Sequence, residues 1–147
     1  NLHKKMIHMI DYALILSKNG ISKTKFRINL INLFYSSNKS FSVDEILDYY
    51  SNSINKVTIY RALKDFETKD LIHRVPDKNF IKKYAISKNK TCNSNYSNHS
   101  HFVCYSCNET FCLDYLKNPN YSSLKGFKVK KLNITLEGYC AKCTVLS

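Results

Sequence analysis

Glycine and proline are scarce in this chain of 147 residues, which contains 3 glycines and 2 prolines. These counts exclude a collagen-like repeat and low-complexity linker character. Long hydrophobic runs are missing as well. The most apolar opening segment, Met6 to Leu16, is interrupted by His8 and Asp11, so it cannot span a bilayer. The segment has a helical period and no small-residue cleavage site after it, which argues against a secretory signal.

Acidic residues are also few. The chain has 11 Asp and Glu against 23 Lys and Arg, which gives a formal net charge of +12. Such a surplus in a short chain indicates a polyanionic partner, either nucleic acid or an anionic membrane surface. The apolar fraction of 44% is typical of a globular protein and excludes a wholly disordered chain. Because no targeting segment is recognisable, we expect a cytoplasmic protein in which thiols stay reduced.

Cysteine is absent from residues 1–91, and six cysteines follow. Four of them form two Cys-x-x-Cys pairs, Cys104/Cys107 and Cys140/Cys143. In a reducing compartment this spacing predicts zinc ligands rather than disulfides, because four thiolates from two short turns make a tetrahedral cage. Asn108 follows the first pair, where a chain leaving such a turn often needs the left-handed conformation that Asn tolerates. The alternative is four ordinary buried thiols.

Two histidines, His99 and His101, precede the first pair on a predicted strand. Residues two apart on a strand share a face, so both imidazoles point the same way, whereas Cys104 points to the opposite face. This geometry predicts a second metal site. The plainer alternative is a solvated strand without ligands.

Spare ligands for a second site are available along the chain at His73, Cys92 and Cys112. Cys92 lies in a polar segment, which is an unusual place for a hydrophobic filler. Cys112 is flanked by Phe111 and Leu113 and is also compatible with a core position. His73 is equally compatible with a half-buried, hydrogen-bonded histidine.

An α+β organisation in two domains is predicted. Residues 88–98 are polar, rich in Asn and Ser, and have no apolar period, so we predict a hinge between domains 1–87 and 99–147. The first domain is predicted to contain helices followed by a two-stranded wing, with strands at 71–75 and 80–87.

Four helices are predicted in the first domain. The first carries Ile7, Ile10 and Leu14 on one face and is closed by Asn19-Gly20. The second begins near Ser22 or Thr24 and directs three apolar residues inward, namely Leu30, Ile31 and Phe34. The third follows a capping box at 42–45, and the fourth covers about 55–69.

The second domain is predicted to alternate strands with one short helix. The expected strands are 99–104, 109–113 and 127–136, the last with a bulge at Lys130-Lys131. The expected helix covers 114–125, although it contains a proline.

The fourth helix has one apolar stripe, formed by Ile59, Leu63 and Phe66. Residues off this stripe are predicted DNA contacts, namely Lys56, Thr58, Tyr60, Arg61 and Lys64. Tyrosine can contact a thymine methyl or a phosphate, and arginine can bind guanine bidentately. The alternative is a surface helix with snorkelling side chains. The basic wing that follows favours DNA.

Five motifs occur in an order that resembles the ferric uptake regulator (Fur) family. They are Thr24-x-x-Arg27, Thr58-Ile-Tyr-Arg61-Ala-Leu63, Leu71-Ile72, His99-x-His101-x-x-Cys104-x-x-Cys107 and Gly138-x-Cys140-x-x-Cys143. The resemblance covers about residues 12–143. It implies a winged-helix DNA-binding domain, a small α+β dimerisation domain with a structural zinc held by four cysteines, and a regulatory metal that favours the DNA-binding homodimer. The implied partner is double-stranded DNA, as an AT-rich palindromic operator.

The family resemblance alone does not identify the sensed metal, because members of the family sense different metals. Members that sense iron or peroxide typically use a histidine before the third helix and an acidic residue in the second wing strand, where this chain has 39–41 (Lys-Ser-Phe) and Ala85. The chain is more similar to the zinc uptake regulator branch. That similarity implies a regulatory zinc held by four residues, His73, Cys92, His99 and His101. Cys112 is the alternative thiol, and Fe²⁺ or Mn²⁺ is the alternative metal.

We therefore expect a metal-responsive repressor of metal-uptake genes, and no enzymatic activity. The first alternative is an iron- or peroxide-responsive regulator of the same family. A small zinc enzyme needs a positioned general base, and the chain contains neither a His-x-Glu nor a His-Glu-x-x-His motif. A zinc-ribbon subunit that does not bind DNA would not need Tyr60 and Arg61 on a helix surface.

Overall fold

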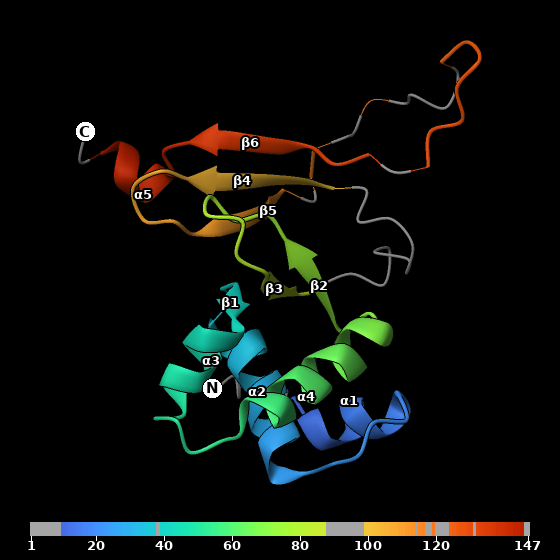
Figure 1. Ribbon diagram of the computed structural model, residues 1–147, viewed down its shortest axis with the longest axis vertical. Coiled ribbons are helices and arrows are strands. Elements are labelled where there is room, and N and C mark those ends of the chain that lie inside the picture. The colour runs from blue at the N-terminus through green and yellow to red at the C-terminus, as the bar shows by residue number, and fades with distance from the viewer. Residues whose placement is uncertain are drawn as a thin grey trace, which may run out of the picture.

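The structure is a computed structural model that describes residues 10–37, 39–87, 99–113, 115–116, 119, 124–130 and 132–145. It is of the α+β class, with helices at one end, a second sheet at the other and a small first sheet between them (Figure 1). The predicted hinge at 88–98, with Cys92, lies outside the described residues. None of the helices among the described residues has the length and apolarity to cross a membrane.

The first half has the helices and wing of a winged-helix domain. Its elements are α1 (Tyr12–Lys18), α2 (Lys25–Ser37), β1 (Phe41–Ser42), α3 (Val43–Tyr49), α4 (Lys56–Thr68), β2 (Ile72–Val75) and β3 (Lys83–Ile86). The strands form an antiparallel sheet in the order β1-β3-β2. The core beneath them consists of fully buried apolar side chains, among them Leu16, Leu30, Ile31, Phe34, Ile46, Ile59, Leu63, Phe66 and Ile72. The predicted helices and wing strands are found, with shorter strands than expected. The first helix is seen from Tyr12 onward, so Ile10 precedes it, and Ile7 lies outside the described residues.

The predicted helix boundaries have local causes that the structure confirms. At the start of α3, the Ser42 hydroxyl accepts from the Glu45 N–H (3.1 Å), and the Glu45 carboxylate accepts from the Ser42 N–H (2.7 Å). The Asn55 side chain caps α4 by accepting from the Val57 N–H. Gly20, with φ of +68°, ends the turn after α1.

Two expectations for the first half need correction. Ile10 and Leu14 are about half exposed, and Leu16 is the fully buried residue of α1. This helix of two turns packs on α2 through a face that is rotated from the one its apolar spacing indicated. β1 was not predicted, because two residues are too few to show a strand period, and it forms only by pairing with β3.

The second half is a sheet followed by a short helix. Its elements are β4 (Ser100–Cys104), β5 (Thr110–Leu113), β6 (Thr135–Gly138) and α5 (Ala141–Thr144). The sheet order is β5-β4-β6, in which β4 and β5 are antiparallel and β4 and β6 are parallel. Asn108, in the turn between β4 and β5, has the expected positive φ of 57°.

The strand predicted at 127–136 is wrong in position. Residues 127–130 and 132–134 are not in a strand, and β6 begins at Thr135. The cause is pairing: β6 lies parallel to β4 with Thr135 opposite His101, and an apolar period cannot indicate where such non-local pairing starts. The predicted helix at 114–125 is not seen at its described residues, 115, 116, 119, 124 and 125, and its other residues and the Lys131 half of the predicted bulge lie outside the described part.

Candidate metal centres and nucleic-acid interface

Four cysteine sulfurs meet where β4 ends and α5 begins, and we call this group the four-cysteine cluster. The Sγ atoms of Cys104, Cys107, Cys140 and Cys143 all lie within 4.8 Å of one another. Because β4 and β6 pair with Cys104 opposite Gly138, the chain reaches Cys140 beside the end of β4. The sulfurs of Cys107 and Cys140 are 3.9 Å apart. This separation fits the edge, about 3.8 Å, of a tetrahedron whose metal–sulfur bonds are about 2.3 Å long.

In the four-cysteine cluster, neighbouring thiolates would repel one another, and a bound cation would offset this repulsion. Backbone N–H groups of Cys107, Cys140 and Ser106 donate toward the Cys104 sulfur and lower the pKa of this thiol to about 6, against the effect of burial. At Cys107, the Glu109 N–H lowers the pKa, but burial and the neighbouring thiols raise it to about 12. Four thiolates at this distance repel one another, so the cluster ionises fully only around a metal ion.

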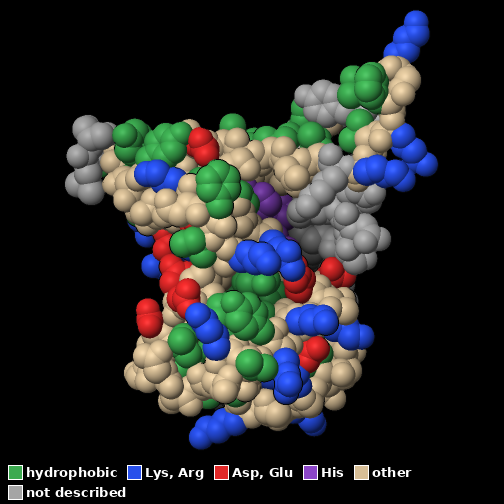
Figure 2. All heavy atoms as spheres, viewed as in Figure 1, with side chains coloured by type: hydrophobic (Ala, Val, Ile, Leu, Met, Phe, Trp, Pro, Cys, Tyr) green, Lys and Arg blue, Asp and Glu red, His purple; other side chains and the backbone are tan. Residues whose placement is uncertain are grey.

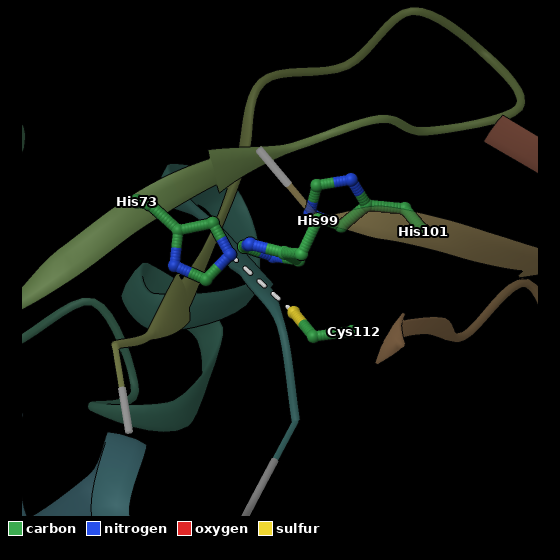
Figure 3. A group of neighbouring side chains, drawn as sticks. All are labelled: His73, His99, His101 and Cys112. Carbon is green, nitrogen blue, oxygen red and sulfur yellow. Dashed lines mark hydrogen bonds between the residues drawn. The ribbon is translucent and has the colours of Figure 1, made fainter. Parts of the chain in front are cut away.

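A second group of donors, which we call the histidine–cysteine cluster, joins the wing to the second sheet (Figure 3). One donor atom from each of His73, His99, His101 and Cys112 lies within 4.8 Å of the others. His73 comes from β2, while His101 and Cys112 are directly opposite each other on β4 and β5. The His73 Nε2 atom is 3.3 Å from the Cys112 sulfur. Three imidazoles and one thiol thus converge on one point, separate from the four-cysteine cluster, as the strand geometry predicted.

The histidine–cysteine cluster is shielded from solvent. His99 and His101 are buried, with exposures of 7% and 6%, and histidine side chains are visible in a recess between the two halves (Figure 2). Burial, and to a lesser degree the nearby His99, lower the pKa of His73 to about 4, so this imidazole is neutral at pH 7. A neutral imidazole has the lone pair that a metal requires, and nitrogen and thiolate donors suit zinc.

The orientation of the His73 ring is fixed from behind by Ser87. The His73 Nδ1 atom lies 3.2 Å from the Ser87 hydroxyl oxygen, at the end of the wing. With Nδ1 as donor in this bond, the lone pair of the ring is on Nε2, the atom that faces Cys112. Sequence reasoning missed Ser87, because its proximity depends on the β2–β3 register, in which His73 pairs with Ala85 and Ser87 is the diagonal neighbour.

Cys92 and Cys112 were the two candidate thiol ligands for this cluster, and the structure describes the position of only one of them. Cys112 lies in the cluster, whereas Cys92 lies outside the described residues. The signal for Cys112 was available in principle. A hairpin whose turn covers 105–108 pairs residue 104 with 109 and so places residue 112 opposite His101.

The predicted DNA contacts all lie on the exposed surface of α4, namely Lys56, Thr58, Tyr60, Arg61 and Lys64. The opposite face of the helix is buried through Ile59, Leu63 and Phe66, as predicted. Tyr60 is 51% exposed, which is a large fraction for an aromatic side chain on a packed helix. Lysine and arginine side chains are spread over the end of the molecule that contains the helices α1 to α4 (Figure 2).

A rigid connection leads from α4 to the histidine–cysteine cluster. The helix ends with Asp70 in the left-handed conformation (φ 55°), and the Leu71 N–H donates to the Phe66 carbonyl (2.9 Å). A second bond, from the Asp70 N–H to the Glu67 carbonyl, completes a Schellman motif. The strand β2 starts at the next residue and carries His73. His73 is thus connected to the end of α4 by a short, hydrogen-bonded turn.

Comparison with known proteins identifies one family. The model of the ferric uptake regulator family matches residues 18–137. Similar solved structures include a zinc uptake regulator complexed with zinc and DNA, with 17% identity, a TM-score of 0.65 and coverage of 90% of each chain. Holo XcZur has 20% identity, a TM-score of 0.62 and coverage of 88% of this chain and 91% of that one. The Vibrio cholerae ferric uptake regulator has 17% identity, a TM-score of 0.59 and coverage of 88% of this chain and 100% of that one. These likenesses show the fold. The search of curated proteins found no significant match.

Replacing one cysteine of the four-cysteine cluster tests its metal. Cys140→Ser leaves an incomplete cage, and metal binding in such sites contributes folding free energy. We expect the variant to lose about one zinc per chain and to melt at a lower temperature, measured by elemental analysis and calorimetry. Cys112→Ser is the control and keeps this zinc. An unchanged zinc content and melting temperature in Cys140→Ser would contradict the assignment.

Removing the Ser87 hydroxyl tests the orientation of His73. Ser87→Ala should weaken zinc binding at the histidine–cysteine cluster by about 10- to 100-fold, which is typical for the loss of a hydrogen-bond partner behind a ligand. The measurement is zinc competition against a chelator, with the zinc of the four-cysteine cluster retained. Ser53→Ala, in the turn between α3 and α4, is the matched control. Equal affinities in Ser87→Ala and the parent would show that this hydrogen bond does not orient the ring.

Proposed function

We propose that this chain, which belongs to the ferric uptake regulator family, senses zinc and represses metal-uptake genes when it is loaded with zinc. Family membership makes it a metal-responsive DNA-binding regulator and not an enzyme. The observation that carries the zinc proposal is the histidine–cysteine cluster, whose donor atoms come from both halves of the chain and lie within 4.8 Å of one another.

The donor set favours zinc over iron or manganese. Three imidazoles and a thiolate match the borderline character of Zn²⁺, whereas harder ions prefer carboxylate and other oxygen donors. The cluster of described residues contains no carboxylate. The residue opposite His73 on the second wing strand is Ala85, where iron- and peroxide-sensing members would have an acid. An iron- or peroxide-responsive regulator remains the second candidate, and Fe²⁺ or Mn²⁺ its metal.

We assign different roles to the two clusters. Cys104, Cys107, Cys140 and Cys143 would hold a structural zinc, because all four come from the second half and join its C-terminal helix to its first strand. His73, His99, His101 and Cys112 would hold the regulatory zinc, because they connect the wing to the second sheet. Cys92, the thiol that the family resemblance implied, is replaced by Cys112 in this proposal.

The regulatory role follows from the position of His73. A bound ion supplies one point to which donors of both halves attach. His73 is tied to α4 by the Schellman motif, while His99, His101 and Cys112 belong to the second sheet. Fixing His73 to that sheet therefore fixes the angle of α4 relative to the second half, which alters DNA affinity.

We propose a cytoplasmic homodimer in which residues 1–87 bind DNA, 88–98 form the hinge and 99–147 form the dimerisation domain. Two copies of α4 at a defined spacing would read successive major grooves, so the operator would be a palindrome, and we expect it to be AT-rich. The zinc uptake regulator of similar fold was solved with zinc and DNA. In this chain, Tyr60 and Arg61 would contact bases, while Lys56, Thr58 and Lys64 would contact the backbone.

Variants of α4 test the DNA interface. Arg61→Ala should cost about 1–3 kcal/mol of binding free energy at the operator if it makes a bidentate base contact. Lys64→Ala should weaken binding to all sequences alike and lower the salt slope by about 1. Lys128→Ala, which removes an exposed lysine far along the chain, controls for net charge. Unchanged operator affinity in Arg61→Ala and Tyr60→Ala, with the fold intact, would remove α4 from the interface.

The metal and its ligands are tested together by DNA binding during titration with free Zn²⁺ and Fe²⁺. Fluorescence anisotropy with an AT-rich palindrome should show activation by Zn²⁺ at lower free concentration than by Fe²⁺. His101→Ala should keep the zinc of the four-cysteine cluster and lose the response to Zn²⁺, because three ligands bind more weakly than four.

The two thiols serve as a matched pair in the same titration. Cys112→Ser should shift the Zn²⁺ midpoint to higher concentration, and Cys92→Ser should leave it unchanged. The reverse pattern would assign the ligand to Cys92. A parental response in His101→Ala would show that the histidine pair is not the sensor.

A further inference from the structure

We infer that the hairpin of the first cysteine pair, residues 104–110, is a docking platform for the turn of the wing, residues 76–82, and that Thr110 is the positioning residue of this contact. The inference rests on the proposed function, because it concerns how His73 is held near the other three donors. It also assigns a role to Thr110, which belongs to neither metal cluster and is not among the predicted DNA contacts.

Direct contacts join the hairpin to the wing turn. The Thr110 hydroxyl donates to the carbonyl oxygen of Pro76 (2.8 Å), and Thr110 is only 7% exposed. The Lys78 ammonium lies 5.4 Å from the centre of the Tyr105 ring, within the range of a cation–π interaction. Tyr105 is itself fixed, because its hydroxyl donates to the Glu137 carboxylate (2.8 Å). A partly buried neutral hydrogen bond and an exposed charge contact therefore act at the same place.

The wing turn is held firmly on its other side. The Asp77 side chain is 3% exposed, and one of its oxygens accepts from the Asn79 N–H (2.8 Å). Its other oxygen lies 3.7 Å from the ammonium of Lys83, which also bonds the Glu45 carboxylate at 3.1 Å. Glu45 closes the capping box at the start of α3. The turn thus connects the hairpin to the start of α3, which packs against α4.

The Thr110 contact lies beside the histidine–cysteine cluster, because Thr110 and the proposed ligand Cys112 are both on β5. Thr110 and Cys112 are two residues apart on β5 and so share a face. Their partners, Pro76 and His73, are close together along β2 and the residue that follows it. The hydrogen bond at Pro76 therefore keeps β2 beside β5, so that His73 already faces Cys112 when a metal ion arrives. Such preorganisation lowers the cost of forming the site.

The test is Thr110→Val, which keeps the shape of the side chain and removes its donor. Zn²⁺ affinity at the histidine–cysteine cluster, measured by chelator competition, should fall about 3- to 10-fold, the range expected for one hydrogen bond. Zinc content of the four-cysteine cluster should not change. Amide hydrogen exchange of residues 77–82, in protein with zinc in the four-cysteine cluster only, should become faster. Thr110→Ser should restore both properties, and Thr135→Val, at an exposed position of β6, should match the parent.

Parental Zn²⁺ affinity and parental exchange in Thr110→Val would overturn the inference. If Thr110→Val does not fold, Lys78→Gln at the exposed turn provides the second variant, with the same direction of change expected and the parental values as the contradicting result. The exchange measurement needs no metal in the histidine–cysteine cluster. It therefore detects the docking contact even if the cluster turns out not to be the sensor, which separates a failure of this inference from a failure of the proposed function.

Discussion

Three imidazoles and one thiol meet because β2 brings His73 to the edge of the second sheet. The other three donors lie within one small sheet and need only its strand register, whereas His73 belongs to the half that carries α4. The regulatory proposal depends on this one contact between the halves. Without it the donor set would be reduced to two histidines and a cysteine, and a bound metal would have no connection to α4, the helix that we propose reads DNA.

The donors of the two clusters become available to a metal ion for different physical reasons. In the four-cysteine cluster, mutual repulsion makes full ionisation depend on a cation, as the opposite pKa shifts of Cys104 and Cys107 indicate. In the histidine–cysteine cluster, burial keeps His73 neutral, so its lone pair is available at neutral pH without competition from protons. In our proposal, metal binding at the first would contribute mainly to the fold of the second half. Metal binding at the second would restrain the two halves relative to each other, which is the requirement for a switch.

Local patterns were sufficient for much of the fold and the four-cysteine cluster. The capping box at Ser42, the apolar stripe of α4 and the two Cys-x-x-Cys pairs each act over a few residues, and each was found where expected. Pairing between distant segments could not be predicted in this way. The position of β6 follows from its parallel register with β4. Cys112 was predicted as the alternative thiol, and its place opposite His101 follows from the register of the β4–β5 hairpin. Ser87 and Thr110 depend on the β2–β3 register and on contact between the halves, for which a single sequence has no local signal.

X-ray absorption spectroscopy at the zinc edge tests the central claim most directly, because it reports the donor atoms themselves. With two zinc ions per chain, the spectrum averages over both sites, and the parent should show five sulfur donors and three imidazole nitrogens for each pair of zinc ions. Cys112→Ser should remove the sulfur of the second site alone. A spectrum with only the four-sulfur site, or a second zinc surrounded mainly by oxygen donors, would contradict a zinc sensor built from His73, His99, His101 and Cys112.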